Sequence, residues 1–261
     1  MNKESVIREA RCLLSVGLLT ATMVTAACNV AAQGSSESSV IDPHAQNILK
    51  QMGDFLAATK EFSFKAEVTT DEVAVGIHKI QLTDKIEAIV RRPNKLWVTE
   101  SGDFMNKRFW YDGRTVSILS LVDLFYATSK VPNKIDKALD DMMDRYGVTT
   151  PVVDFLVSNP YESLMENVTG AMYVGLHDVG GVYCHHLAFA QDDLDWQIWI
   201  ESGKRFLPRK FVVTYKNDPG SPTVVTVFKS WDFSTKHSDR LFEFKPPDNA
   251  RKIDFLPLTE M

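Results

Sequence analysis

The stretch NKRFWYDGRTVSILS, residues 106–120, decides the fold, because it holds the clearest turn between two strands in the chain. Strand-forming residues precede and follow Asp112-Gly113. Asp-Gly is a favoured pair in the tight turn of a β-hairpin, since both residues tolerate a positive φ. The stretch therefore predicts two antiparallel strands, Asn106–Tyr111 and Thr115–Ser120, joined by a short turn.

Outward from this hairpin, much of the chain repeats the same pattern. Apolar and polar residues alternate, and Gly, Pro, Asn or Asp residues stand between the alternating runs. A period of two is typical of strands with one buried face. The predicted strands before the hairpin lie at about 62–68, 80–90 and 96–98, and those after it at about 124–127, 169–179, 182–190, 194–201, 207–216, 222–232 and 241–244.

Three segments show helical features instead. Asp42-Pro43 predicts a helix start, and apolar residues at helical spacing continue that helix to about Thr59. A second helix is predicted over residues 134–146 and a short third one over residues 161–166. Helices placed before and between runs of antiparallel strands predict an α+β fold. No low-complexity linker divides the chain, so we expect a single domain over residues 42–261.

Residues 1–32 predict an export signal peptide. Basic residues precede an apolar run from about Leu13 to Val24, and small residues follow it. This order is typical of a secretory signal, and the run is too short to span a membrane. Cleavage after Ala32 would release a soluble periplasmic protein, in which residues 33–41 form a flexible tether. Cleavage before Cys28 would instead give a lipid-anchored protein, and the sequence allows both outcomes.

The composition of the exported chain limits its partners. Removing three basic and two acidic residues with the signal leaves 26 basic and 32 acidic residues, a net charge of −6. An acidic balance argues against nucleic acid and against electrostatic binding to anionic lipid headgroups. Once Cys28 is removed or lipidated, Cys184 is the single free cysteine, so no internal disulfide is expected.

Seven runs of residues along the exported chain carry a resemblance to a known family. They are the run from DPHA at 42–45 to Phe64, FWYDGRT at 109–115, RYG at 145–147, YVG at 173–175, GGVYCHHL at 180–187, DWQIWI at 195–200 and LPRK at 207–210. Together they resemble an uncharacterised family of predicted bacterial periplasmic proteins, over about residues 42–255.

The resemblance implies a fold more than an activity. The family looks like the lipoprotein carriers LolA and LolB, which have an open, curved antiparallel sheet (a half-barrel) with helices covering the concave face. In those relatives the hollow holds acyl chains, and other members of the fold group sense envelope stress. No lipid-contacting residue of the carriers can be matched to this chain, so none is transferred.

His177, Cys184 and His186 form a weak candidate metal site. A turn at Gly180-Gly181 would place His177 opposite Cys184, with His186 diagonal to it on the same face. The alternative is that the opposite face of this hairpin belongs to the core, which leaves the three as ordinary surface or edge residues. That opposite face carries Met172, Val174, Leu176, Leu187 and Phe189. We predict no bound metal.

Bulky apolar side chains on the predicted strands and on the second helix are candidates for a ligand-binding surface. Rings on strands can line an apolar pocket or form an ordinary core, and Met side chains adapt to irregular partners. The sequence allows both interpretations. The candidates are Trp97, Phe109, Tyr111, Met142, Met143, Trp196 and Trp199.

The chain lacks the motifs of common enzymes. It contains no G-x-S-x-G, H-E-x-x-H, C-x-x-C or P-loop sequence, so we predict neither catalysis nor a cofactor. The predicted function is a periplasmic binding module that shields a lipid or a lipoprotein acyl chain. The alternatives are an envelope interaction or sensor protein without a ligand, and a hydrolase or metal-dependent enzyme. Possible partners are an apolar lipid, an envelope protein and, only with Cys28 lipidated, the membrane.

Overall fold

The computed structural model describes residues 41–74 and 78–258. The predicted signal peptide at 1–32, residues 33–40 of the tether and the possible lipidation site Cys28 lie outside the described residues. Within the described residues, no helix is long and apolar enough to cross a bilayer.

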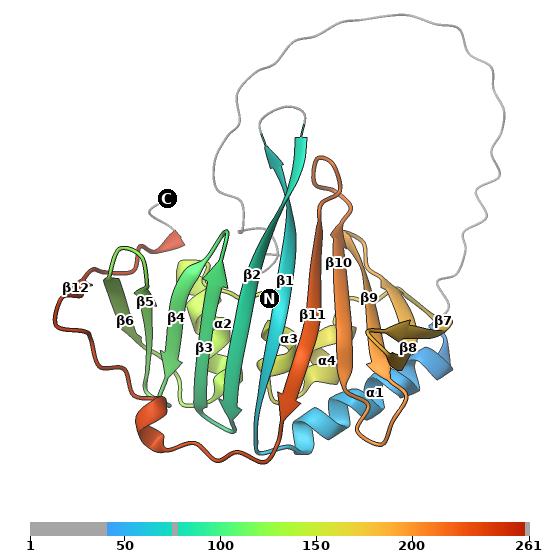
Figure 1. Cartoon of the computed structure of the whole chain (residues 1–261), viewed down its shortest axis with the longest axis horizontal. Helices are drawn as coiled ribbons and strands as arrows, with labels where there is room; N and C mark the ends of the chain where they lie inside the picture. The colour runs from blue at the N-terminus through green and yellow to red at the C-terminus, as the bar shows by residue number, and fades with distance from the viewer. Residues whose placement is uncertain (1–40, 75–77, 259–261) are drawn as a thin grey trace, which may run out of the picture. The chain divides into compact units, whose positions relative to one another are not determined.

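One open sheet of twelve strands forms the framework of the described chain (Figure 1). The strand order is β12-β6-β5-β4-β3-β2-β1-β11-β10-β9-β8-β7, which makes β12 and β7 the edges. Neighbouring strands are antiparallel, except that β12 runs parallel to β6. The strands are β1 (Glu61–Ala74), β2 (His78–Arg91), β3 (Lys95–Gly102), β4 (Asn106–Tyr111), β5 (Thr115–Ser120), β6 (Phe125–Lys130), β7 (Gly170–Val179), β8 (Val182–Ala190), β9 (Leu194–Glu201), β10 (Pro208–Tyr215), β11 (Thr223–Asp232) and β12 (Arg251–Lys252).

Four α-helices in the described residues complete the fold, and its α+β class is the one that the sequence predicts. They are α1 (Pro43–Ala58), α2 (Ile135–Tyr146), α3 (Val153–Leu156) and α4 (Pro160–Met165). The carboxylate of Asp42 caps α1 by accepting a hydrogen bond of 2.8 Å from the backbone N–H of His44. The residue after α2, Gly147, has a φ of 65°, a left-handed conformation that suits glycine. The sequence does not predict α3, because four residues are too few to show a helical period.

The sheet has two faces with different coverage. We call the side that faces α2, α3 and α4 the inner face; in Figure 1 these helices lie behind the sheet. Alternation along β1 turns Phe62, Phe64, Ala66 and Val68 to this side, and all are buried. On the same side, Phe155 of α3 packs against Phe211 and Phe228, with ring centroids 5.4 and 5.0 Å away.

Directly after β11, Phe233 still packs against Phe62 on the inner face, but the chain from Phe242 onward packs on the other side, the outer face. Phe242 is fully buried, and the guanidinium of Arg91 lies 4.8 Å from its ring centroid. Phe244 packs against Trp110 and Tyr126, which point outward from β4 and β6. The predicted strand at 241–244 is therefore wrong: residues 239–241 form a 3-10 turn, and the apolar residues bury their rings on the sheet instead of pairing with it.

Candidate ligand-binding face

The inner face of β3, β4 and β5 is lined by bulky apolar side chains. Strand register places Phe109 between Val98 and Ile118, and Tyr111 between Leu96 and Val116. The hydroxyl of Tyr111 donates a hydrogen bond of 2.7 Å to the carbonyl of Pro132. Burial, together with the charge of Asp112, raises the pKa of Tyr111 to about 12. Tyr111 therefore stays neutral and acts as a fixed wall of this face.

The inner face of β8, β9 and β10 is aromatic as well. Phe189 and Trp196 are paired across β8 and β9, and their rings stack with centroids 3.9 Å apart. Trp196 also touches Phe211 on β10, at a centroid distance of 5.8 Å. The phenyl ring of Phe155 then links this region to the helices. Together the two halves form one apolar surface across the inner face.

The helices cover this apolar surface on the inner side of the sheet. Met142 is fully buried and Met143 is 4% exposed, so α2 directs both flexible side chains inward. Polar contacts tie the cover to the sheet: the hydroxyl of Thr150 donates to Glu100 at 2.7 Å. The guanidinium of Arg92 donates to the carbonyl of Val157.

The seven residues predicted to bind a ligand do not share one surface. Phe109, Tyr111 and Trp196 lie on the inner face, and Met142 and Met143 belong to its cover. Trp97 pairs with Trp110, and Trp199 pairs with His186, so both of these tryptophans point to the outer face. Trp97 and Trp199 are therefore separated from the other five residues, because side chains alternate along β3 and β9.

The two outer tryptophans have polar surroundings. Trp199 stacks on His186 with centroids 4.0 Å apart, and the ammonium of Lys210 lies 4.6 Å from its ring centroid. The guanidinium of Arg108 lies 5.5 Å from the ring of Trp97. Cation–π contacts of this kind suit a half-exposed surface.

Only two of the three residues of the candidate metal site, His177 and His186, contact each other through their side chains. His177 lies opposite Cys184 as predicted, and the Nδ1 atoms of His177 and His186 are 3.0 Å apart. The thiol of Cys184 donates instead to the carbonyl of Val182, at 3.4 Å. Among the residues that the structure describes, no group of three His, Cys, Asp or Glu side chains is placed to hold a metal ion.

The burial around this cluster differs from both predicted interpretations. Cys184 is fully buried and His186 is 9% exposed, although both belong to the outer face. Burial lowers the pKa of His186; Gln197 opposes this effect, while the charges of His177 and Lys210 add to it. His186 is therefore held neutral, between a hydrogen bond to Gln197 and the ring of Trp199.

The expected core face of β7 is also corrected. Leu187 and Phe189 are buried on the inner face, but Met172, Val174 and Leu176 are exposed. A β-bulge between Tyr173 and Gly175 shifts the register, so that Met172 pairs with Ala188 and points outward. Gly175 has a φ of 147°, which glycine adopts readily.

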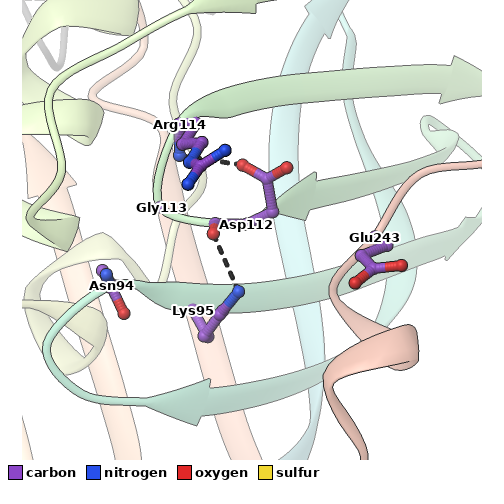
Figure 2. A pocket seen from close by; sticks show the side chains of 6 residues that line it. All are labelled: Asn94, Lys95, Asp112, Gly113, Arg114 and Glu243. Atoms are coloured by element: carbon purple, nitrogen blue, oxygen red, sulfur yellow. Dashed lines mark hydrogen bonds between the residues drawn. The ribbon is translucent and has the colours of Figure 1, made fainter.

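A polar cavity of about 320 Å³ lies at the turns between β2 and β3 and between β4 and β5 (Figure 2). It is lined by Asn94, Lys95, Asp112, Gly113, Arg114 and Glu243. The ammonium of Lys95 donates to the backbone carbonyl of Asp112 at 2.8 Å. The sequence predicts the turn at Asp112-Gly113, but not this cavity, because Glu243 arrives from the C-terminal segment. Its polar lining does not suit an acyl chain.

Comparison with known families shows which family the chain belongs to. A family model described as "Predicted periplasmic protein (DUF2092)" matches residues 45–256. The chain belongs to the DUF2092 family of predicted periplasmic proteins. This membership confirms the resemblance expected from the sequence. No curated protein matches the chain.

Solved structures resemble the DUF2092 chain in fold. The Mycobacterium tuberculosis lipoprotein LppX is 13% identical, with 75% of this chain and 98% of LppX covered and a TM-score of 0.43. An uncharacterized conserved protein from Thermus thermophilus is 9% identical, with 81% and 99% covered and a TM-score of 0.46. A LolA superfamily protein from Nitrosomonas europaea is 9% identical, with 77% and 97% covered and a TM-score of 0.34.

Proposed function

We propose that this protein is a non-catalytic periplasmic binding module that shields a lipid or a lipoprotein acyl chain between the inner face and its helical cover. One observation carries the proposal. The segment from α2 to α4, residues 135–165, lies against the inner face (Figure 1), where Phe155 packs on Phe211 and Phe228, and is inserted in the chain between β6 and β7. Because residues 135–165 contribute no strand to the sheet, this cover can lift without breaking a pairing between strands.

The energetics favour an apolar ligand over an empty open state. Lifting the cover exposes the rings of Phe109, Trp196 and Phe211 on one side and the side chains of Met142 and Met143 on the other. A buried CH₂ group contributes about 0.8 kcal/mol, so an acyl chain of about a dozen carbons recovers on the order of 10 kcal/mol. Met side chains can repack around such a chain because they are unbranched and flexible.

The periplasmic location also forms part of the proposal. The family is described as periplasmic. We propose export through the signal peptide at residues 1–32, followed by cleavage after Ala32 or by lipidation of Cys28. Native mass spectrometry of protein purified from its own envelope gives the mature N-terminus and the mass of any bound lipid.

A pair of tryptophans on one strand tests the binding site. Trp196→Ala should weaken binding of a fluorescent fatty acid at least tenfold, because Trp196 lies on the inner face. Trp199→Ala is the matched control on the outer face and should leave the affinity unchanged. Circular dichroism spectra and unfolding midpoints show whether each variant is folded.

A second variant is expected to speed up binding of the probe. Misfolding would reduce binding, so it could not produce this result. Thr150→Val removes the hydrogen bond to Glu100 that ties the cover to β3. We expect the fatty-acid probe to bind several times faster, since the cover opens more often. Protein that binds no probe and carries no lipid from the envelope would overturn the proposed function.

A further inference from the structure

Exposed apolar side chains gather at one end of the strands β1 to β6. These six strands are consecutive neighbours in the sheet, so the last residues of β1, β3 and β5 and the first residues of β2, β4 and β6 all lie at the same end (Figure 1). We call the exposed apolar residues at this end the apolar rim. The apolar rim consists of Val73, Ile80, Phe104, Val122 and Phe125. Val122 is 69% exposed and Phe104 is 42% exposed.

The opposite end of the same strands is different. Its turns are formed by residues 92–94 and 112–114, which are mostly polar. In the described part of residues 61–134, every exposed large hydrophobic side chain belongs to the apolar rim. Single exposed apolar residues are ordinary on protein surfaces, but their confinement to one end of six adjacent strands is not.

The turn that carries Phe104 is braced so that its ring stays exposed. The carboxylate of Asp84 accepts hydrogen bonds from the backbone N–H groups of Phe104 and Met105, at 3.0 and 3.1 Å. The carboxylate of Asp103 accepts one from the N–H of Thr83, at 3.0 Å. Two acidic side chains thus fix the turn, and Phe104 at its tip remains 42% exposed.

The C-terminal segment extends the apolar rim at β6. Ile253 donates its backbone N–H to the carbonyl of Tyr126 at 2.9 Å, and Ile253 itself is 45% exposed. The guanidinium of Arg251 lies 5.8 Å from the ring centroid of Phe125. An apolar ring beside an Arg side chain is a pairing that suits the boundary between headgroups and acyl chains.

We propose that the apolar rim docks on the surface of a zwitterionic lipid bilayer. Neighbouring strands lie about 4.8 Å apart, so β3 to β6 present Phe104, Val122 and Phe125 in a row roughly 14 Å long. The β1–β2 hairpin carries Val73 and Ile80 further out, because β2 pairs with the last residue of β3, Gly102, only at Asp84. Such a row of separate projecting tips can insert between headgroups, whereas a protein interface needs a closely packed central patch. Acidic and basic residues are mixed at this end, where Lys79 forms an ion pair with Asp71 at 3.2 Å and Arg251 lies beside Phe125, so no attraction to anionic lipid is expected.

The entry point of the chain is compatible with this orientation. Ile41 forms a bridge with Ala171, at the start of β7. By the antiparallel alternation, β7 starts at the same set of strand ends as the apolar rim. Twelve residues separate Cys28 from Ile41, and an extended chain of that length reaches about 40 Å. An N-terminus attached to a membrane therefore leaves the rim free to reach it.

Vesicle flotation tests the docking without relying on the fatty-acid site. The full chain carrying Cys28→Ser is exported, purified and mixed with vesicles of phosphatidylcholine and phosphatidylethanolamine, so that no lipid anchor contributes. We expect this protein to float with the vesicles at both low and high salt. Adding Phe104→Ser and Val122→Ser should lower its partition into vesicles at least tenfold.

A matched control carries the same chemical change at another exposed site. Leu176→Ser with Tyr183→Ser removes two exposed apolar side chains from the β7–β8 hairpin, 50% and 65% exposed, and should float like the parent. Absence of flotation, or an equal loss in both double variants, overturns the docking proposal. Capture of an envelope protein through Phe104 and Val122, without flotation, also overturns it. Fatty-acid binding is measured separately, so failure of one proposal does not imply failure of the other.

Discussion

At the scale of single residues, Asp71 shows how one buried carboxylate joins three strands. It lies on β1 and is 5% exposed. It accepts hydrogen bonds from Gln81 on β2, at 3.0 Å, and from the hydroxyl of Thr223 on β11, at 2.7 Å. Burial alone would raise the pKa of Asp71, but these hydrogen bonds and Lys79 lower it to about 2.

Replacing Asp71 with Asn should cost on the order of 2 kcal/mol of unfolding free energy at neutral pH. The pKa is lower in the folded state than the ordinary 3.8, so this stability is present above that value and is lost as the pH falls towards 2. Urea unfolding at neutral pH and near pH 2 measures the difference. Asp54→Asn is the control, since Asp54 forms an exposed ion pair with Lys50 and should cost little. A loss that does not depend on pH would contradict this explanation.

Cys184 should be chemically inert in the folded protein. Burial raises the pKa of its thiol to about 11; Arg209 opposes this effect, while Glu201 and Asp178 add to it. Thiolates, not thiols, react with disulfide reagents. Ellman's reagent should therefore react with Cys184 only in urea, whereas a Tyr183→Cys variant, with its thiol at the exposed neighbouring position, should react at once. Fast reaction of native Cys184 would show that β8 opens locally.

At the scale of secondary-structure elements, the contact between α1 and α4 depends on Gly53. A Cβ atom on Gly53 would lie 2.5 Å from the Cβ of Tyr161 and 2.9 Å from its backbone nitrogen. Gly→Ala in a helix normally stabilises a protein by about 1 kcal/mol. Here we expect Gly53→Ala to destabilise it by about 1–3 kcal/mol, because α4 must move away. Asn47→Ala, at an exposed position of α1, should be neutral or stabilising in the same thermal unfolding experiment, and stabilisation by Gly53→Ala would contradict the packing.

At the scale of the whole molecule, the C-terminal segment closes an edge of the sheet. β12 pairs with β6, which would otherwise leave an edge free to pair with another chain. Truncation after Pro246 removes β12 and should cause concentration-dependent self-association in sedimentation velocity. Truncation after Pro257 keeps β12 and serves as the control. Equal sedimentation of both truncated proteins would show that β12 does not protect the edge.

Features set by neighbouring residues could be predicted from the sequence. The hairpins at Asp112-Gly113 and Gly180-Gly181, the cap of α1 at Asp42 and the end of α2 at Gly147 are all found in the structure. Each depends on φ angles or hydrogen bonds within a few residues, so the local sequence is sufficient. The α+β class follows from the order of these elements.

Features set by distant residues could not be predicted. Leu96, Trp97 and Val98 are all apolar, so alternation alone does not tell which of them faces the helices. The side that α2 and α3 cover decides it, and Trp97 and Trp199 fall on the other side. The β-bulge at Val174 changes the side that Met172 faces.

The sequence by itself determined the hairpin turns, the start of α1, the end of α2, the strands from β1 to β11 in their order along the chain, and the family. The tertiary structure alone decided which face is inner, where the C-terminal segment packs and that Phe104 and Val122 share one end of the sheet. The physical reason is that periodicity reports only that successive side chains point to opposite sides. Burial of a given side depends on segments far away in the chain that pack against it.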